Sequence, residues 1–145
     1  MKNKIFIIIL ILNQIFFVNK VFSQEIDIQA TDIEFLKNQN VTIANNATAI
    51  IKKDGIIIKG EKIEYFKDKS FLLIKNGKIS TTTENLKIQS KIIEYEIDRS
   101  NLYLKGDVEV IDDINNLVMN SNEVNYNLKE RKITSFNSSE ITDKI

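Results

Sequence analysis

Hydrophobic and polar residues alternate along most of the chain beyond residue 24, and short polar clusters interrupt the alternation. In residues 62–66 the apolar Ile63 and Tyr65 follow charged neighbours, a polar turn comes next at 67–70, and an apolar run follows at 71–74. Alternation with a period of two, bounded by turn-forming residues, is typical of β-strands. No 11-residue window beyond residue 24 has a helical apolar stripe. The pattern therefore predicts an all-β fold.

The alternating stretch occurs four times, at steps of 30, 30 and 31 residues. The copies are Ile33-Glu34-Phe35, Ile63-Glu64-Tyr65, Ile93-Glu94-Tyr95 and Val124-Asn125-Tyr126. Eleven residues beyond each aromatic residue stand Asn46, Asn76, Gly106 and Asn137. A fixed period of this size indicates repeated supersecondary units. Each unit reads as two or three short strands, ten to twelve in all, and Asp54-Gly55 predicts one of the hairpin turns.

Two repeat architectures agree with this period. In a parallel β-solenoid, equivalent residues stack about 4.8 Å apart, which would align Glu34, Glu64 and Glu94 in one column of carboxylates. Such a column costs on the order of 1 kcal/mol for each adjacent pair at the surface. An antiparallel meander or roll places the equivalent residues further apart. The sequence therefore favours the antiparallel arrangement.

The composition excludes several kinds of chemistry. The 145 residues include 20 basic and 20 acidic residues but no His, Cys, Pro or Trp. The usual general base at neutral pH, the thiolate nucleophile and the soft metal ligands are thus missing, and the four glycines form no phosphate-binding loop. We expect no enzyme activity, no cofactor and no metal site. An enzyme that uses a carboxylate pair for acid–base catalysis is an alternative, and Asp112 and Asp113 are the candidate pair. Neighbouring strand residues point to opposite faces, so the pair is better interpreted as part of a solvated turn.

The first 23 residues resemble an export signal. Lys2 and Lys4 precede the apolar stretch 5–18, which as a helix spans roughly 21 Å and is short of a bilayer core of about 30 Å. We expect a signal-peptide helix at 1–23, cleaved after Ser23, with an uncleaved membrane anchor as the alternative. The mature domain, 24–145, would then hold 17 basic and 20 acidic residues, because three lysines leave with the signal. A mildly acidic exported domain is a poor candidate for nucleic-acid binding.

Two segments in the C-terminal half carry a resemblance to a known family. Residues 88–110, IQSKIIEYEIDRSNLYLKGDVEV, and residues 118–136, VMNSNEVNYNLKERKITSF, contain a small or polar residue, then I/V-x-Y, a charged turn and an apolar strand. The first segment adds the step Gly106-Asp107-Val108-Glu109-Val110. This pattern resembles the OstA-like domain of the LptA family, periplasmic bridge proteins of lipopolysaccharide transport. The resemblance extends over residues 28–140.

The resemblance implies an open, twisted antiparallel β-jelly-roll of about four 30-residue hairpin repeats, whose inner face takes up lipopolysaccharide acyl chains. Our candidate lipid-binding residues are the apolar positions expected to face inward. They are Ile63, Tyr65, Leu72, Ile74, Ile93, Tyr95, Leu102, Leu104, Val108, Val110, Val124 and Tyr126. Aliphatic residues of this kind suit acyl chains. They are equally ordinary in a filled protein core, so the sequence leaves open whether the roll contains a groove.

The resemblance also implies partners at the ends of the sheet. Segments 25–35 and 123–136 contain no proline, and an unblocked edge strand accepts another chain by strand addition. Lys129 and Lys132 could instead protect the second edge. The expected partners are lipopolysaccharide and other OstA-like domains, the inner-membrane LptC-like and outer-membrane LptD-like components, with self-association into homo-oligomers also allowed. The alternatives are a membrane-anchored LptC-like relative and a structural β-repeat protein that assembles without lipid.

Overall fold

The computed structural model describes residues 26–144, and this part of the chain is all-β, as predicted. Ten strands form one antiparallel sheet. Their bounds are β1 Ile26–Gln29, β2 Asp32–Leu36, β3 Val41–Ile51, β4 Ile56–Phe66, β5 Phe71–Thr81, β6 Leu86–Glu96, β7 Asn101–Asp112, β8 Leu117–Asn127, β9 Lys132–Ser135 and β10 Ser139–Asp143. The predicted signal peptide lies outside the described residues.

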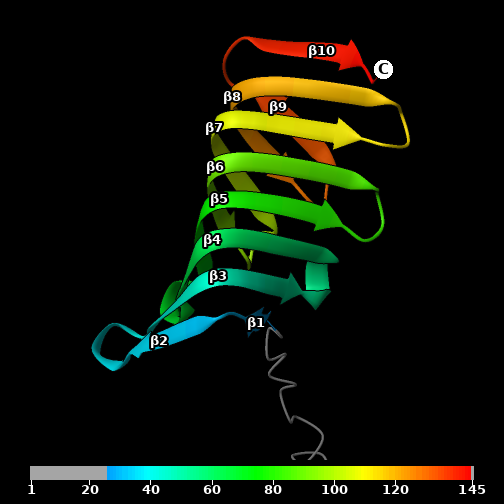
Figure 1. Cartoon of the computed structure of the whole chain (residues 1–145). Coiled ribbons are helices and arrows are strands. Elements are labelled where there is room, and N and C mark those ends of the chain that lie inside the picture. Colours follow the sequence, from blue (N-terminus) through cyan, green and yellow to red (C-terminus); the bar gives the residue numbers. More distant parts are fainter. Residues whose placement is uncertain (1–25, 145) are drawn as a thin grey trace, which may run out of the picture.

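The sheet is a meander with interrupted edge strands. Its order is β1-β3-β4-β5-β6-β7-β8-β10, with β2 also paired to β3 and β9 also paired to β8 (Figure 1). β1 and β2 pair with different halves of β3, and β9 and β10 pair with different halves of β8. Each of these pairs acts as one edge strand that is broken in the middle. The sheet thus follows eight strand paths, two for each of the four sequence repeats.

This topology explains the 30-residue period. One repeat contains two successive antiparallel strands, so equivalent residues lie two strands apart. Glu64 pairs with Leu73, and Leu73 pairs with Glu94. Since neighbouring strands lie about 4.8 Å apart, the two glutamates are separated by roughly 10 Å. The predicted antiparallel roll is therefore confirmed, and the carboxylate column of a solenoid does not form.

The long strands bend near the middle instead of ending there. Asn46 in β3 and Asn76 in β5 have φ of 46° and 47°, and Gly106 in β7 has φ of 75°. Asn and Gly tolerate this left-handed conformation better than most residues, and at such a bulge the backbone changes direction while the pairing resumes on the other side. Each repeat thus holds two strands, within the predicted two or three, but the uninterrupted strands β3 to β8 are 11 or 12 residues long and not short. Asn137, the fourth member of this series, lies in the break between β9 and β10.

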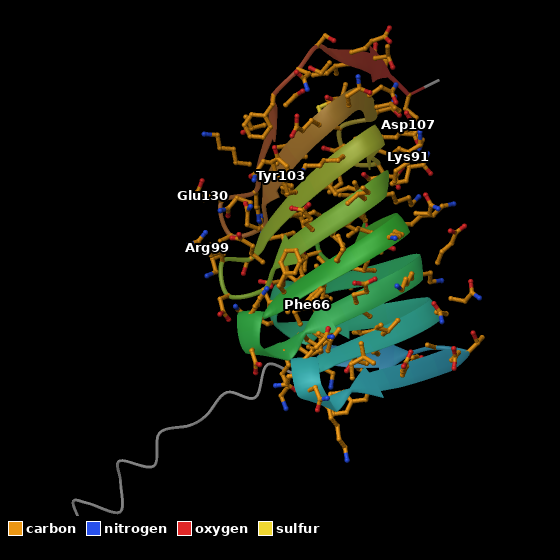
Figure 2. The ribbon with its side chains drawn as sticks, turned by 90° about the vertical axis from the view of Figure 1, so that its left-hand side faces the viewer. Phe66, Lys91, Arg99, Tyr103, Asp107 and Glu130 are labelled. Carbon is orange, nitrogen blue, oxygen red and sulfur yellow. The ribbon has the colours of Figure 1, made fainter. Side chains whose placement is uncertain are left out.

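The bend folds the sheet into two layers around one core. The tyrosine layer contains β2, β9 and the strand segments 41–46, 61–66, 71–76, 91–96, 101–106 and 122–127. The opposite layer contains β1, β10 and the other halves of the long strands. One hydrophobic cluster includes side chains from both layers. Figure 2 shows Lys91 and Asp107 on the bent side and Arg99 and Glu130 on the other side, where the turns after β6 and β8 lie.

Small residues line the inside of the bend. A Cβ atom added to Gly60 would lie 2.4 Å from Cγ2 of Ile74, and one added to Gly77 would lie 2.4 Å from Cδ1 of Ile93. Ser90 is paired with Gly77 and is buried, and its hydroxyl donates to the carbonyl of Ile92 at 2.8 Å. These small side chains leave space for the large core residues of both layers to meet.

The turns at both ends of the strands also repeat with the period of the sequence. The last turn residue has positive φ in one series at Asn40, Ser70, Ser100 and Arg131, and in a second series at Gly55, Asn85 and Asn116. Gly55 closes the hairpin predicted from Asp54-Gly55, with φ of 61°. Its carbonyl accepts a hydrogen bond of 2.8 Å from the backbone nitrogen of Thr82, which joins two neighbouring turns.

Candidate functional site

Ten of the twelve predicted lipid-binding residues form two continuous rows across five strands of the tyrosine layer. One row is Ile63, Ile74, Ile93, Leu104 and Val124, and the other is Tyr65, Leu72, Tyr95, Leu102 and Tyr126. Every neighbour in each row is a direct cross-strand partner. The remaining two residues, Val108 and Val110, lie in the opposite layer. The tertiary structure thus brings all twelve residues to the inner side of the roll.

Much of the facing surface, in the opposite layer, was not predicted from the sequence. Residues of the opposite layer that belong to the same core and were not predicted are Ala47, Ala49, Ile51, Ile56, Ile58, Ile79, Leu86 and Ile88. The signal was available, because Ile56 and Ile58 alternate around Ile57, and Leu86 and Ile88 alternate around Lys87. Ala47, Ala49, Ile51 and Ile79 follow the bend of their strand, and Ile56, Ile58, Leu86 and Ile88 precede it. All eight therefore lie in the halves of the long strands outside the tyrosine layer.

The inner face is filled by its own side chains in this structure. Eleven of the twelve predicted residues keep at most 4% of their surface exposed, and Tyr65 is half-buried and packs against the core. A void wide enough for an acyl chain would leave part of its lining accessible to water. The midsection of the roll therefore holds no such void between these residues.

Polar contacts close the side of the roll opposite the bend. We call this line the seam: it is where turns 52–55 and 82–85 meet turns 97–100 and 128–131. The Tyr95 hydroxyl donates to Asp54, and Ser100 Oγ donates to Oδ1 of the same carboxylate at 2.7 Å. Nearby, Lys53 Nζ donates to the carbonyl oxygen of Ile97 at 3.1 Å.

A second set of contacts closes the seam two strands further along the sheet. The Tyr126 hydroxyl donates to Glu84, and Arg131 Nε forms an ion pair of 2.8 Å with Oε1 of the same carboxylate. Burial raises the pKa of Tyr126 above its ordinary value, and the hydrogen bond to Glu84 raises it further. Burial also raises the pKa of Tyr95, and the hydrogen bond to Asp54 adds to this effect. Both tyrosines therefore stay protonated and act as hydrogen-bond donors at neutral pH.

The core is less covered at the two ends of the roll. Ile26 and Ile28 of β1 are partly buried at one end, and Met119 and Ile133 are partly buried at the other. Large apolar side chains are also exposed beside these ends: Ile33, Phe35, Phe136 and Ile141 are between 51% and 62% exposed. Apolar surface at an unpaired sheet edge is typical of a site of association.

The two predicted docking segments lie at these ends. The described part of segment 25–35, residues 26–35, contains β1 and most of β2, which both pair with β3. Segment 123–136 contains β9 and the half of β8 with which it pairs, and Lys132 is exposed on β9. The prediction omitted β10, which covers the other half of β8.

Asp112 and Asp113, the carboxylate pair considered for catalysis, make different structural contacts. Asp112 accepts hydrogen bonds from the backbone nitrogens of Ile114 and Asn115, at 3.0 and 2.9 Å, and so forms the turn after β7. Asp113 pairs with Lys87 at 2.7 Å and with Lys144. Within residues 26–144, no group of three or more acidic side chains is placed to hold a metal ion. The helical segments of that range are likewise too short or too polar to cross a membrane.

These features define a class of protein: an antiparallel β-roll with an apolar interior and unpaired edges at both ends. The chain matches the family described as lipopolysaccharide-assembly, LptC-related, over residues 5–145. It therefore belongs to this family, in agreement with the resemblance noted in the sequence.

A solved structure supports the same fold. The chain is similar to LptH of Pseudomonas aeruginosa, described as the LptA homologous periplasmic component of the conserved lipopolysaccharide transport device. The TM-score is 0.73 at 12% identity, and the match covers 82% of this chain and 94% of LptH. At this identity the likeness concerns the fold. No curated protein matches the sequence.

Proposed function

We propose that this protein is a non-enzymatic periplasmic scaffold for lipopolysaccharide transport. Its inner face shields acyl chains, and its edges pair with neighbouring OstA-like domains to connect the inner and outer membranes. The observation that carries this proposal is the pair of apolar rows that cross five strands inside a roll of the LptC-related family. A continuous apolar track, and not an isolated pocket, is what a long apolar chain needs.

The energetics favour such a scaffold. An acyl chain of a dozen carbons costs roughly 10 kcal/mol to expose to water, at about 0.8 kcal/mol per methylene group. Several chains on one lipid therefore need a continuous cover across an aqueous gap. The rows of Ile, Leu, Val and Tyr offer that cover only when the two layers move apart, because the core is filled in the closed roll.

The edges support the bridging part of the proposal. β1 and β2 lie at one end of the stack of strands and β9 and β10 at the other (Figure 1). Two such domains can therefore pair end to end and extend the apolar track. We propose LptC-like and LptD-like domains as the partners, with homo-oligomers formed by the same edges. The description of LptH as a periplasmic component supports this location for our chain.

Site-specific photocrosslinking tests the lipid contact. A benzophenone amino acid replaces Tyr65, which is half-buried on the inner face, and in a matched control replaces Tyr103, which lies in the outer row between Glu94 and Asn125. We expect a lipopolysaccharide adduct at position 65 and none at 103 in cells. Absence of an adduct at 65 and also at Ile133, or equal adducts on both faces, would contradict the proposal.

A membrane-anchored LptC-like role is a second candidate, because the family match begins at residue 5 and so includes most of the predicted signal. Mass spectrometry of the protein isolated from cells distinguishes the two. A mature chain that starts at Gln24 excludes the anchor, and an intact N-terminus recovered with the membrane fraction excludes the cleaved form.

A structural β-repeat protein without lipid is a third candidate, and the filled core favours it. This function predicts oligomers whose size depends on concentration and in which no lipid co-purifies. Lipid extracted from the purified protein, together with the adduct at position 65, would exclude it.

A further inference from the structure

The seam contains a cavity of about 440 Å³ between its two sides. Residues 52–55 and 81–84 line it from the opposite layer, and residues 128, 129 and 131 line it from the tyrosine layer. The cavity is thus bounded by turns that would separate if the roll opened.

The lining has an excess of positive charge. Four cationic side chains, Lys52, Lys53, Lys129 and Arg131, face two carboxylates, Asp54 and Glu84. The tyrosine hydroxyls of the seam already donate to both carboxylates.

Two of the lysines donate to main-chain carbonyls. The partner of Lys53 is the oxygen of Ile97, and that of Lys129 is the oxygen of Asp98. A cation gains a stronger hydrogen bond from an ionised phosphate than from a neutral carbonyl. The lysines therefore favour a phosphate group over their present partners.

The lining of the cavity includes one large apolar side chain. Leu128 lines the cavity and also packs against the hydrophobic core. If the phosphate of a ligand lies in this cavity, the part of the ligand next to the phosphate can contact Leu128 at the edge of the core. This combination of basic side chains and an apolar contact that leads to the core matches an amphiphile with an anionic headgroup.

We propose that the seam cavity binds the phosphate-bearing headgroup of a lipid between Lys53 on one side and Arg131 on the other, and that the bound phosphate bridges the two sides of the seam. The inference rests on the proposed function, since it concerns how the roll holds a lipid. Lys53 and Arg131 each bond across the seam, one to Ile97 and the other to Glu84. These cations come from opposite sides of the seam, so a phosphate that holds both needs the two sides close together. It therefore binds the closed roll better than the open roll and shifts the population toward the closed form.

The test uses the full chain and three probes. Dioctanoyl phosphatidic acid carries both phosphate and acyl chains, pyrophosphate carries phosphate alone, and dioctanoylglycerol carries acyl chains alone. Affinity is measured by calorimetry for the wild type, for Lys53→Gln and Arg131→Gln, and for Lys91→Gln, whose ion pair with Asp107 lies on the bent side. Circular dichroism checks that each variant is folded.

We expect the wild type to bind phosphatidic acid and pyrophosphate, and each seam variant to lose at least about 10-fold in affinity, the loss that corresponds to about 1.4 kcal/mol. Lys91→Gln should bind like the wild type. Equal affinities in all variants would overturn the proposal. Binding of pyrophosphate without phosphatidic acid would show a site for free phosphate and would overturn the headgroup assignment.

Opening is measured with a thiol placed in the core. The sequence has no cysteine, so Val124→Cys introduces a single thiol at a fully buried position. Phosphatidic acid should slow labelling of this thiol at least about 10-fold, and this protection should disappear in the Lys53→Gln and Arg131→Gln backgrounds. Unchanged labelling in the presence of bound phosphatidic acid would overturn the coupling.

The two proposals fail in different ways. If the lipopolysaccharide adduct at position 65 forms equally in the wild type and in Lys53→Gln with Arg131→Gln, the seam site is wrong and the proposed function stands. If pyrophosphate and phosphatidic acid bind as expected but no lipopolysaccharide adduct forms, the transport function is wrong and the headgroup site stands.

Discussion

At the scale of single residues, the tyrosines of the repeat have two roles. Their rings belong to an inner row, and the hydroxyls of Tyr95 and Tyr126 donate to carboxylates on the other side of the seam. Tyr103 differs, because it lies on the outer face beside Phe136, with ring centroids 5.8 Å apart, and its hydroxyl donates to Glu123. Tyrosine therefore closes the roll at positions 95 and 126 and covers the outer surface at position 103.

Replacing the inner tyrosine tests its contribution to closure. Tyr95→Phe keeps the buried ring but removes the donor to Asp54, so we expect the free energy of unfolding to fall by about 1 kcal/mol. Tyr103→Phe is the matched control, with an expected change within about 0.5 kcal/mol because the site is at the surface. Urea denaturation of both variants measures the difference. Equal losses would show that the seam bond contributes no more than a surface bond.

At the scale of single elements, each long strand depends on a residue that accepts positive φ. Asn76 has φ of 47° in the middle of β5, and its side chain donates to Oε2 of Glu61 at 2.7 Å. The strand passes from one layer to the other at this point. The bend is thus a property of the strand and not a connection between two strands.

Substitution at the bend tests this interpretation. Asn76→Val places a β-branched residue at positive φ, and we expect a loss of about 1–3 kcal/mol in the free energy of unfolding. Asn76→Gly keeps the backbone conformation accessible and should cost less than half as much. Chemical denaturation measures both. If the valine variant were as stable as the glycine variant, the left-handed conformation would not determine the bend.

The ion pair of Asp113 with Lys144 adds a side-chain contact to the backbone pairing that joins the C-terminal edge strand β10 to β8. Lys87 of β6 and Lys144, which follows β10, both contact this carboxylate and lower its pKa to about 2. The carboxylate has an ordinary pKa of 3.8. Its contribution to stability is therefore present above pH 3.8 and is lost as the pH falls toward 2.

We expect Asp113→Asn to accelerate hydrogen exchange of the β10 amides at neutral pH and to have little effect well below pH 2, where the wild-type carboxylate is also protonated. Asp107→Asn, which removes the ion pair with Lys91 on the bent side, should leave β10 unchanged. Exchange measured by NMR at both pH values provides the comparison. A difference that persisted at the lower pH would exclude the ionised carboxylate as its cause.

At the scale of the whole molecule, the roll has a closed midsection and two ends that are suited to association. The same meander that buries the two apolar rows leaves interrupted strands at both ends. Exposed Ile33 and Phe35 lie on one edge strand, and exposed Ile141 lies on the other. Transport through a series of such domains would require both the opening of the seam and the pairing of these edges.

Charged substitutions at an edge test the association. The Phe35 side chain on β2 is 51% exposed. Phe35→Asp introduces a charge there and should weaken self-association, or binding of an OstA-like partner, at least about 10-fold. Ile114→Asp is the matched control, since Ile114 is 64% exposed but lies in the turn after β7. Analytical ultracentrifugation measures the dissociation constants. Equal effects of both variants would exclude β2 as the docking edge.

The sequence by itself determined the all-β class, the four repeats and the twelve inward positions. Each of these follows from local information: alternation assigns a residue to one face of a strand, and a fixed period of 30 residues makes each repeat occupy the same place in the meander. The hairpin at Asp54-Gly55 was equally local, because glycine accepts the positive φ that the turn requires.

The tertiary structure alone decided that the strands continue through Asn46, Asn76 and Gly106, since a residue with positive φ can end a strand or bend it. It also decided the seam. Asp54 and Ser100 are 46 residues apart, and Glu84 and Tyr126 are 42 residues apart, so no local pattern relates them. Whether the apolar faces leave a groove or fill it depends on how closely two bent layers approach, and in the closed roll small residues inside the bend let them fill it.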